Sequence, residues 1–119
     1  MAPFEWDSNK EEENIRKHGV DFRIASQLWD RLVFERIDDR RNYGEIRFLA
    51  FGEIEGRVLA VVFTWRGVAR RLISARKANP SERALFYENP SERALFYENP
   101  SERALFYEEA RRRGGAPPN

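Results

Sequence analysis

The chain has 119 residues and contains no cysteine. Disulfides, thiol catalysis and cysteine-based zinc sites are therefore excluded, and the composition is compatible with a reducing cytosol. No apolar run approaches the roughly 20 residues that are needed to span a bilayer. The beginning of the chain, MAPFEWDSNK, lacks the basic-then-apolar order of a signal peptide. These absences predict a soluble, intracellular protein that is not associated with a membrane.

Strong net charge is also lacking, because 21 basic side chains nearly balance 20 acidic ones. The balance is not uniform along the chain: residues 1–39 have 6 Lys/Arg and 10 Asp/Glu, whereas residues 40–78 have 9 Lys/Arg and 3 Asp/Glu. A basic middle third produces the local field that a polyanion partner would feel. A solvated strand face rich in arginine would have the same composition, so charge alone leaves both interpretations open.

Turn residues and apolar spacing predict two helices followed by several strands. Asp7 and Asp21 are typical N-caps, and Gly19 fits the left-handed position that ends the first helix. That helix has only one large apolar residue, Ile15, so most of its surface is expected to be exposed or to bind a partner. Strands are predicted at residues 4–6, 32–37, 45–54, 57–65 and 68–77, with turns at 55–56 and 66–67. The order predicts an α+β domain in which helices pack on an antiparallel sheet.

The last predicted strand, residues 68–77, is rich in basic side chains. Regular alternation places Arg70 and Arg76 on one face, together with Ser74. Arg71 and Lys77 then lie on the other face. The two pairs are not expected to contact the same phosphate.

The decapeptide NPSERALFYE occurs three times without a mismatch, at residues 79–88, 89–98 and 99–108. In the first copy Asn79 is the expected N-cap, Pro80 the first helical residue and Glu82 the partner in a capping box. Pro90 and Pro100 repeat these start signals, and each would cost about 3 kcal/mol inside a helix. Three short helices or one helix with two kinks are the open alternatives.

Two stretches resemble the ends of the BrnT toxins of bacterial type II toxin–antitoxin systems: FEWDSNKEEENIRKHGVDF at residues 4–22 and RRLISARKANPSERALFYE at residues 70–88. The resemblance implies a RelE-like fold, in which a twisted antiparallel sheet carries two N-terminal helices and a C-terminal helical segment. It also implies a cytoplasmic, metal-independent endoribonuclease that needs no cofactor and blocks translation. The implied partners are RNA and a BrnA-like antitoxin, which neutralises the toxin and is its only link to DNA.

With this resemblance the chain divides into three parts. Residues 1–88 are the expected toxin domain, residues 89–108 are two extra copies of the decapeptide, and residues 109–119 are a basic, flexible tail. The toxin sheet can cover one copy, and we expect the first copy to dock. The apolar side chains of the other copies then predict homo-oligomers or domain swapping: Leu95, Phe96, Tyr97, Leu105, Phe106 and Tyr107. Repeat expansion without a selected role is the alternative.

Metal-independent RNA cleavage needs a base for the 2′-OH, an acid for the leaving 5′-oxygen and cations for the charge that develops on phosphorus. His18, the only histidine, lies beside Lys17 in the KHGV motif of the family, which makes both residues catalytic candidates. A histidine that only caps its helix is the alternative. Arg76, inside the ISAR motif, is the third candidate, because a guanidinium can bind phosphate through two hydrogen bonds.

Other side chains are candidates for binding RNA without taking part in catalysis. Arg66, Arg70 and Lys77 offer positive charge, and Trp6 could stack on a base. For Arg76 and Arg66 the alternative is an ion pair with Glu5, Asp7 or a glutamate of the repeat. For Trp6 it is packing in the core. The sequence contains no metal-binding motif and no glycine-rich phosphate loop. A catalytically impaired homologue that acts only through its interactions is the competing class of function.

Overall fold

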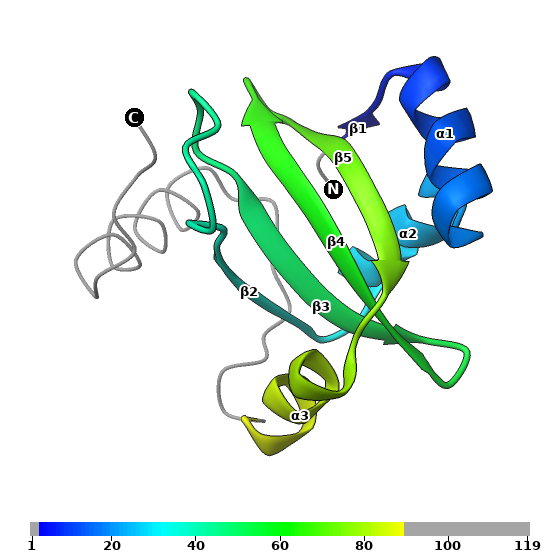
Figure 1. The fold of residues 1–119 in the computed structure, drawn as a ribbon, viewed down its shortest axis with the longest axis vertical. Helices are drawn as coiled ribbons and strands as arrows, with labels where there is room; N and C mark the ends of the chain where they lie inside the picture. Colours follow the sequence, from blue (N-terminus) through cyan, green and yellow to red (C-terminus); the bar gives the residue numbers. More distant parts are fainter. Residues whose placement is uncertain (1–2, 90–119) are drawn as a thin grey trace.

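Figure 1 shows the computed structural model, which describes residues 3–89. The elements in chain order are β1 (Phe4–Glu5), α1 (Ser8–His18), α2 (Phe22–Ser26), the 3-10 helix η1 (Gln27–Asp30), β2 (Val33–Ile37), β3 (Phe48–Ile54), β4 (Arg57–Arg66), β5 (Ala69–Lys77) and α3 (Pro80–Glu88). The predicted α+β class and the order of the elements are confirmed. In this part of the chain no helix is long and apolar enough to cross a membrane.

The five strands form one sheet in the order β1-β5-β4-β3-β2. Neighbouring strands from β2 to β5 are antiparallel, as predicted. β1 adds a short parallel pair at the edge, where Phe4 lies opposite Arg70 and Glu5 opposite Arg71. The Arg70 N–H donates to the Pro3 carbonyl at 3.0 Å. The beginning of the described chain is therefore tied to the last strand of the sheet.

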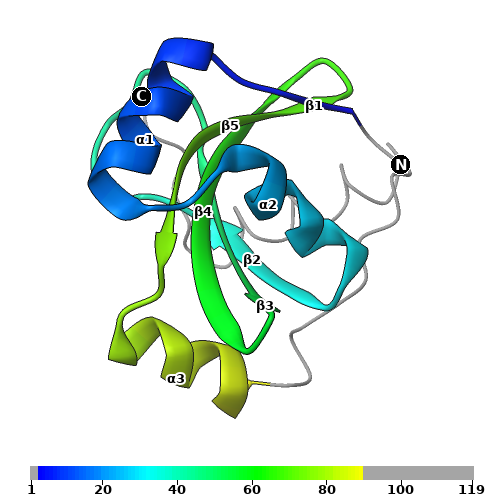
Figure 2. The same cartoon turned by 90° about the vertical axis from the view of Figure 1, so that its right-hand side faces the viewer.

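Two apolar clusters lie on opposite faces of the sheet. The α2–η1 cluster includes Phe22, Leu28 and Phe63. The α3 cluster includes Phe51 and Phe86. Figures 1 and 2 show α2 on one side of the sheet and α3 across one end of the other side. Each face of the sheet thus has its own core.

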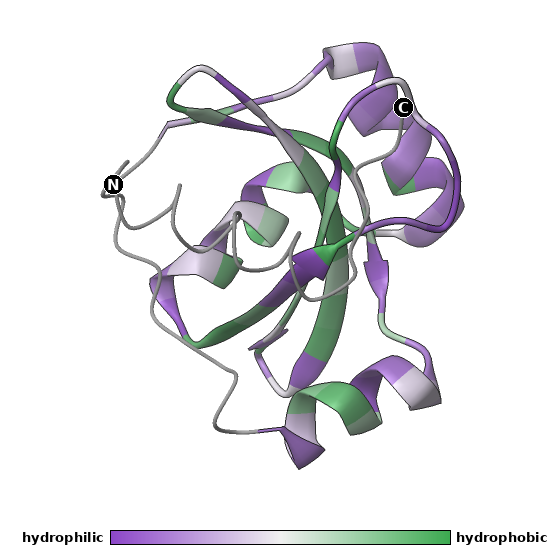
Figure 3. Ribbon diagram, turned by 90° about the vertical axis from the view of Figure 1, so that its left-hand side faces the viewer, coloured by the Kyte–Doolittle hydropathy of each residue, from purple (hydrophilic) through white to green (hydrophobic). Residues whose placement is uncertain are grey.

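α1 docks on the sheet through an amide rather than through an apolar stripe. Figure 3 shows this helix as mostly hydrophilic, and Asn14 is its only buried residue. The Nδ2 of Asn14 donates to the carbonyls of Ala75 at 2.8 Å and Val20 at 2.9 Å, while its Oδ1 accepts from the Ala75 N–H at 3.1 Å. One side chain therefore takes the place of a neighbouring strand at this point of β5, and Ile15 stays exposed, as expected.

The predicted caps and the hairpin turn are present. Asp7 and Asp21 accept hydrogen bonds from the first turns of α1 and α2, and Gly19 ends α1 with a φ of 69°. Between β3 and β4, Glu55 and Gly56 have φ values of 52° and 80°. Two positive values in succession are typical of the type I′ turn, whose twist matches that of the two strands.

β5 contains a β-bulge. Val62 of β4 lies opposite Ser74, whereas the next residue, Phe63, lies opposite Leu72, so Ile73 is an extra residue in β5. A bulge shifts the alternation of side chains by one position. Leu72 accordingly belongs to the α2–η1 cluster, while Ile73 packs against the α3 cluster.

The bulge changes the faces on which the basic residues of β5 lie. Arg70 and Lys77 lie opposite residues that belong to the α2–η1 cluster or pack on it. Arg76 lies opposite a residue of the α3 cluster, and Arg71 is on the same side as Arg76. The prediction that Arg70 and Arg76 share a face is therefore wrong, because it assumed a strand without an irregularity.

α3 is the first copy of the decapeptide, and its predicted capping box is present. The Glu82 N–H donates to Asn79 Oδ1 at 2.9 Å, and the Asn79 N–H donates to Glu82 Oε1 at 2.8 Å. Of the apolar side chains expected to pack on the sheet, Phe86 is 3% exposed but Tyr87 is 49% exposed. Residues 90–119 lie outside the described residues; they contain the six side chains predicted to drive oligomerisation and the tail.

Replacing Asn14 by alanine is expected to destabilise the fold by about 2–3 kcal/mol, because it leaves a buried N–H and a buried carbonyl of β5 without their partner. Exposed Glu12 on the same helix provides the control, and Glu12→Ala is expected to change the stability by less than about 0.5 kcal/mol. Urea denaturation of both variants and of the unchanged protein measures the difference. Equal midpoints for the two variants would show that the amide does not hold α1 on the sheet.

Candidate nucleic-acid interface

The side of the sheet that carries α3 also carries a group of arginines. α3 crosses only one end of this side (Figures 1 and 2). Five arginines of this side that form ion pairs belong to β4, β5 and the connection between β2 and β3. We call these five the arginine face: Arg40, Arg47, Arg66, Arg71 and Arg76. Each member pairs with a carboxylate of the described chain. Such pairs hold the guanidinium groups in place on one surface.

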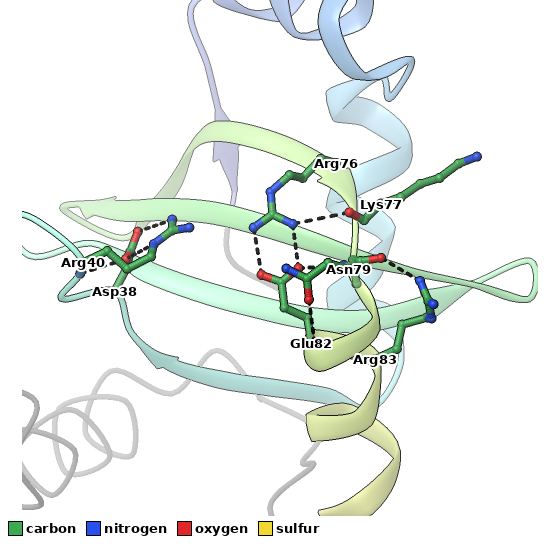
Figure 4. A network of polar contacts seen from close by, with 8 residues as sticks. Asp38, Arg40, Arg76, Lys77, Asn79, Glu82 and Arg83 are labelled. Atoms are coloured by element: carbon green, nitrogen blue, oxygen red, sulfur yellow. Dashed lines mark hydrogen bonds and ion pairs between the residues drawn. The ribbon is translucent and has the colours of Figure 1, made fainter.

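Arg76 and Glu82 form a two-pronged ion pair on the arginine face (Figure 4). Arg76 Nη1 lies 2.6 Å from Glu82 Oε1, and Nη2 lies 2.8 Å from Oε2. Nη1 also donates to the Lys77 carbonyl at 3.3 Å. The hydrogen bonds with Glu82 raise the pKa of Arg76, although burial and the charge of Arg40 act in the opposite direction. The predicted alternative, a pair with a glutamate of the repeat, is therefore what the structure shows.

Glu82 connects the start of α3 to the end of β5. Burial by itself would raise the pKa of Glu82, but the hydrogen bonds from Arg76 and from the Asn79 N–H outweigh it and lower the pKa. A glutamate with a lowered pKa is ionised at neutral pH. The same carboxylate thus caps the helix and neutralises a cation of the arginine face.

A second two-pronged pair lies beside the first in Figure 4. Asp38 accepts from Arg40 Nε at 2.7 Å and from Arg40 Nη2 at 2.8 Å, and also from the Tyr43 hydroxyl at 3.1 Å. Burial would raise the pKa of Asp38, but the contacts with Arg40 lower it. Asp38 is only 2% exposed, whereas about half of the Arg40 side chain faces solvent. The buried acid therefore holds a cation at the surface.

Glu45 joins two more members of the arginine face. Its Oε2 lies 2.9 Å from Arg47 Nε, and its Oε1 lies 4.0 Å from Arg66 Nη2. The guanidinium of Arg47 also lies over the ring of Tyr43, 4.3 Å from its centre. Arg66, predicted to bind RNA, is thus a largely exposed member of this face.

Arg70, another predicted phosphate ligand, lies in the interior instead. It is 1% exposed, and its guanidinium carbon lies 4.5 Å from the ring centre of Trp65 and 4.7 Å from that of Trp29. Its Nη2 lies 3.8 Å from Glu35 Oε2, which also accepts from the indole N–H of Trp29 at 2.6 Å. A buried position does not fit the expected contact with RNA, and Arg70 instead joins β5 to β2 across the α2–η1 face.

His18 and Lys17 occupy the last turn of α1, which lies along the edge of β5. Lys17 pairs with Glu13 of the same helix at 2.8 Å. His18 is exposed, and within residues 3–89 its side chain makes no hydrogen bond or ion pair. The N–H of Gly19 caps the helix instead. No interaction in this part of the chain joins either catalytic candidate to Arg76.

Trp6 and Lys77 are the remaining side chains that were predicted to bind RNA. Trp6 is half-buried, packs against the α2–η1 cluster and meets the ring of Phe22 edge-on, with 5.9 Å between the ring centres. This arrangement favours the alternative of core packing. Lys77 is exposed and points away from the Arg76–Glu82 pair (Figure 4).

The carboxylates of the arginine face are dispersed among guanidinium groups rather than gathered. Within residues 3–89, no group of three or more His, Asp or Glu side chains could hold a metal ion. The groups that this surface offers to a ligand are therefore positively charged, planar hydrogen-bond donors.

Comparison with known proteins identifies the family. Residues 6–82 match the family model described as the ribonuclease toxin, BrnT, of type II toxin–antitoxin systems. The chain belongs to the BrnT family. A solved structure of the family, the ribonuclease toxin BrnT of Brucella abortus, is similar to this BrnT-family chain with a TM-score of 0.52 and 29% sequence identity, over 66% of this chain and 99% of that toxin. No curated protein sequence matches the chain.

The BrnT match confirms the predicted resemblance and its endoribonuclease class. It ends at Glu82, which is the residue that anchors α3 to β5. The extra copies of the decapeptide follow this point, so the family match does not include them.

Part of the arginine face was missed in the sequence. Asp38, Arg40, Tyr43 and Arg47 lie in the connection between β2 and β3, which contains no regular element. The available signal was their composition, since arginines close to carboxylates and an aromatic ring are typical of surfaces that bind phosphates and bases.

Lowering the pH below about 4 is expected to destabilise the protein partly through Glu82. Because its pKa is lowered in the folded chain, the ionised carboxylate stabilises the fold above the ordinary pKa of glutamate. This contribution is lost as the pH falls through the lowered value. The variant Glu82→Gln cannot titrate, so its melting temperature is expected to fall less between pH 7 and pH 3 than that of the unchanged protein.

Glu12→Gln, on the exposed face of α1, is the control and is expected to behave like the unchanged protein. Melting temperatures of the three proteins at both pH values give the comparison. If Glu82→Gln lost as much stability on acidification as the control, the pair with Arg76 would not be the source of the effect.

Proposed function

We propose that this BrnT-family chain cleaves RNA on its arginine face and that the reaction needs no divalent metal ion. Family membership makes the chain a ribonuclease toxin. The position of the site is inferred from one observation, the gathering of five ion-paired arginines on the side of the sheet that α3 leaves partly open. Arginine binds the phosphates of RNA through charge and through paired hydrogen bonds.

RNA phosphates are expected to replace the carboxylates of this face. Glu82 and Asp38 each accept two hydrogen bonds from one guanidinium. A phosphate can accept from the same two donors in the same geometry. The carboxylates therefore keep Arg76 and Arg40 oriented before RNA arrives, which reduces the reorganisation that binding requires.

Arg76 is the catalytic cation in this proposal. Attack of the 2′-OH builds negative charge on the phosphoryl oxygens, and a fixed guanidinium stabilises this charge. Arg66 and Arg71, which are also on this face, are placed to hold neighbouring phosphates. Tyr43, whose ring already lies against Arg47, is an aromatic surface on which a base could stack.

The proton-transfer groups are a separate part of the proposal. The lowered pKa values of Asp38 and Glu82 make these carboxylates weak bases. His18 stays the candidate for proton transfer, with Lys17 as its neighbour, because imidazole can give and take a proton near neutral pH. Both lie on the helix that Asn14 holds against β5, the strand that carries Arg76.

Membership of a toxin–antitoxin family supports the biological part of the proposal. We infer that RNA cleavage by this chain blocks translation in the bacterial cytoplasm. A BrnA-like antitoxin is expected to neutralise the toxin and to provide its only connection to DNA.

Arg76→Ala is expected to lower kcat/KM for RNA cleavage on the order of 100-fold, because a cation near the reacting phosphate is lost. Glu82→Gln is the matched control, since it breaks the same ion pair but leaves the cation, and it is expected to keep most of the activity. Cleavage of a labelled RNA by the two variants measures the difference. Equal losses in both variants would mean that the pair matters only for anchoring α3.

Cleavage is expected to continue unchanged in the presence of EDTA, because the proposed site uses guanidinium groups in place of a metal ion. The rate is measured with the same RNA, with and without EDTA, on protein that has been dialysed against the chelator. Loss of activity that added Mg²⁺ restores would contradict metal-independent cleavage while leaving the arginine face as the binding surface.

A further inference from the structure

Where α3 docks on the sheet, four side chains of the decapeptide make specific contacts. We call this place the α3 site: Arg76, Ala78, Glu53 and those apolar residues of the α3 cluster that belong to β2, β3 and β4. Glu82, at position 4 of the decapeptide, pairs with Arg76. Arg83, at position 5, donates to the Ala78 carbonyl at 2.9 Å.

The other two recognised side chains are aromatic. Phe86, at position 8, is buried in the α3 cluster. Tyr87, at position 9, donates through its hydroxyl to Glu53. Every one of these contacts is made by a side chain whose type recurs ten and twenty residues later, because the three copies are identical.

We propose that the α3 site accepts any copy of NPSERALFYE and that the second copy of the same chain, residues 89–98, takes the site when the first copy leaves it. Its Glu92 and Phe96 provide the same carboxylate and the same ring as Glu82 and Phe86. The start signals repeat as well, since Asn89-Pro90 corresponds to the Asn79-Pro80 cap. The second copy is thus a spare for the last helix of the toxin domain.

The connection to β5 explains why the first copy holds the site. It follows the strand directly, whereas docking of the second copy turns residues 79–88 into a closed loop. Closing a loop of this length disfavours the second copy by on the order of 100-fold. The second copy therefore takes the site only when a change in the first copy weakens the docking of that copy by more than this loop-closure factor.

The same chain is a better source of the spare copy than another chain. A short flexible linker gives its segment an effective concentration in the millimolar range. Exchange between two chains brings no gain over docking within one chain. Each chain has one α3 site and three copies of its own, so the number of docked helices per chain stays the same. Docking of a copy from one chain in the α3 site of another chain would therefore contradict the proposal.

Three full-chain variants test the proposal by stability. Phe86→Asp puts a carboxylate into the apolar cluster and excludes the first copy. Phe96→Asp combined with Phe106→Asp disables the two extra copies and is the matched control. The third variant carries all three changes, so that no intact copy remains.

Urea denaturation at micromolar concentration measures the unfolding equilibrium constant of each variant. The control is expected to change it by less than about twofold, because the first copy stays docked. Phe86→Asp is expected to raise it on the order of 100-fold, the loop factor. The triple variant is expected to raise it at least about tenfold further, because loss of a buried phenylalanine alone costs more than the loop. Equal values for Phe86→Asp and the triple variant would overturn the proposal.

Cross-linking shows which copy occupies the site and from which chain it comes. The chain has no cysteine, so Glu53→Cys combined with Tyr97→Cys gives a single pair for a bismaleimide linker. In the Phe86→Asp background this pair is expected to form a cross-link within one chain, at monomer mass. Glu53→Cys with Tyr87→Cys, without the aspartate, is the positive control. A cross-linked dimer, or no cross-link while the control reacts, would overturn the proposal.

Discussion

A single extra residue in β5 decides what the side chains of that strand can do. The strand bulges at Ile73, so the residues before and after it do not follow one alternation. Leu72 and Ala75 consequently both belong to the α2–η1 cluster, and Arg71 and Arg76 both lie on the side of α3. In a regular strand the two arginines would lie on opposite faces, because an odd number of positions separates them. One core and the arginine face both depend on this irregularity.

Through the Arg76–Glu82 pair, the guanidinium of Arg76 belongs both to the docking of α3 and to the proposed site. The guanidinium that we propose to bind phosphate also anchors the start of α3. A phosphate that takes this guanidinium removes one contact of the helix but leaves Phe86 in its cluster and Tyr87 on Glu53. In the proposed site, binding of RNA and docking of α3 would therefore be coupled through charge, while the apolar part of the docking would be independent of it.

Local signals made the elements predictable, but the placement of side chains depended on contacts between elements. The caps at Asp7, Gly19 and Asn79 and the turn at Glu55–Gly56 are recognisable because each follows from the conformation of a few neighbouring residues. The bulge at Ile73 has no such local signature, since its position is set by the pairing of β4 with β5.

Burial of polar residues was equally hidden in the sequence. Asn14 and Arg70 are typical surface residues by composition, yet both are buried with polar partners from other elements. The candidate site was predictable in its charge and in Arg66 and Arg76. The pair of Arg76 with a glutamate of the repeat was also predictable. Ion pairs such as Asp38–Arg40 were not, because they depend on a connection without regular structure.

The way in which α1 docks also controls how the sheet meets other molecules. Edge strands present free N–H and carbonyl groups, on which a strand of another chain can add. β1 pairs with β5 over two residues only, so it leaves most of that edge without a neighbouring strand. Asn14 occupies both the N–H and the carbonyl of Ala75, with the body of α1 beside it. A foreign strand would have to displace a helix to pair there, so one amide side chain protects this edge against growth of the sheet into aggregates.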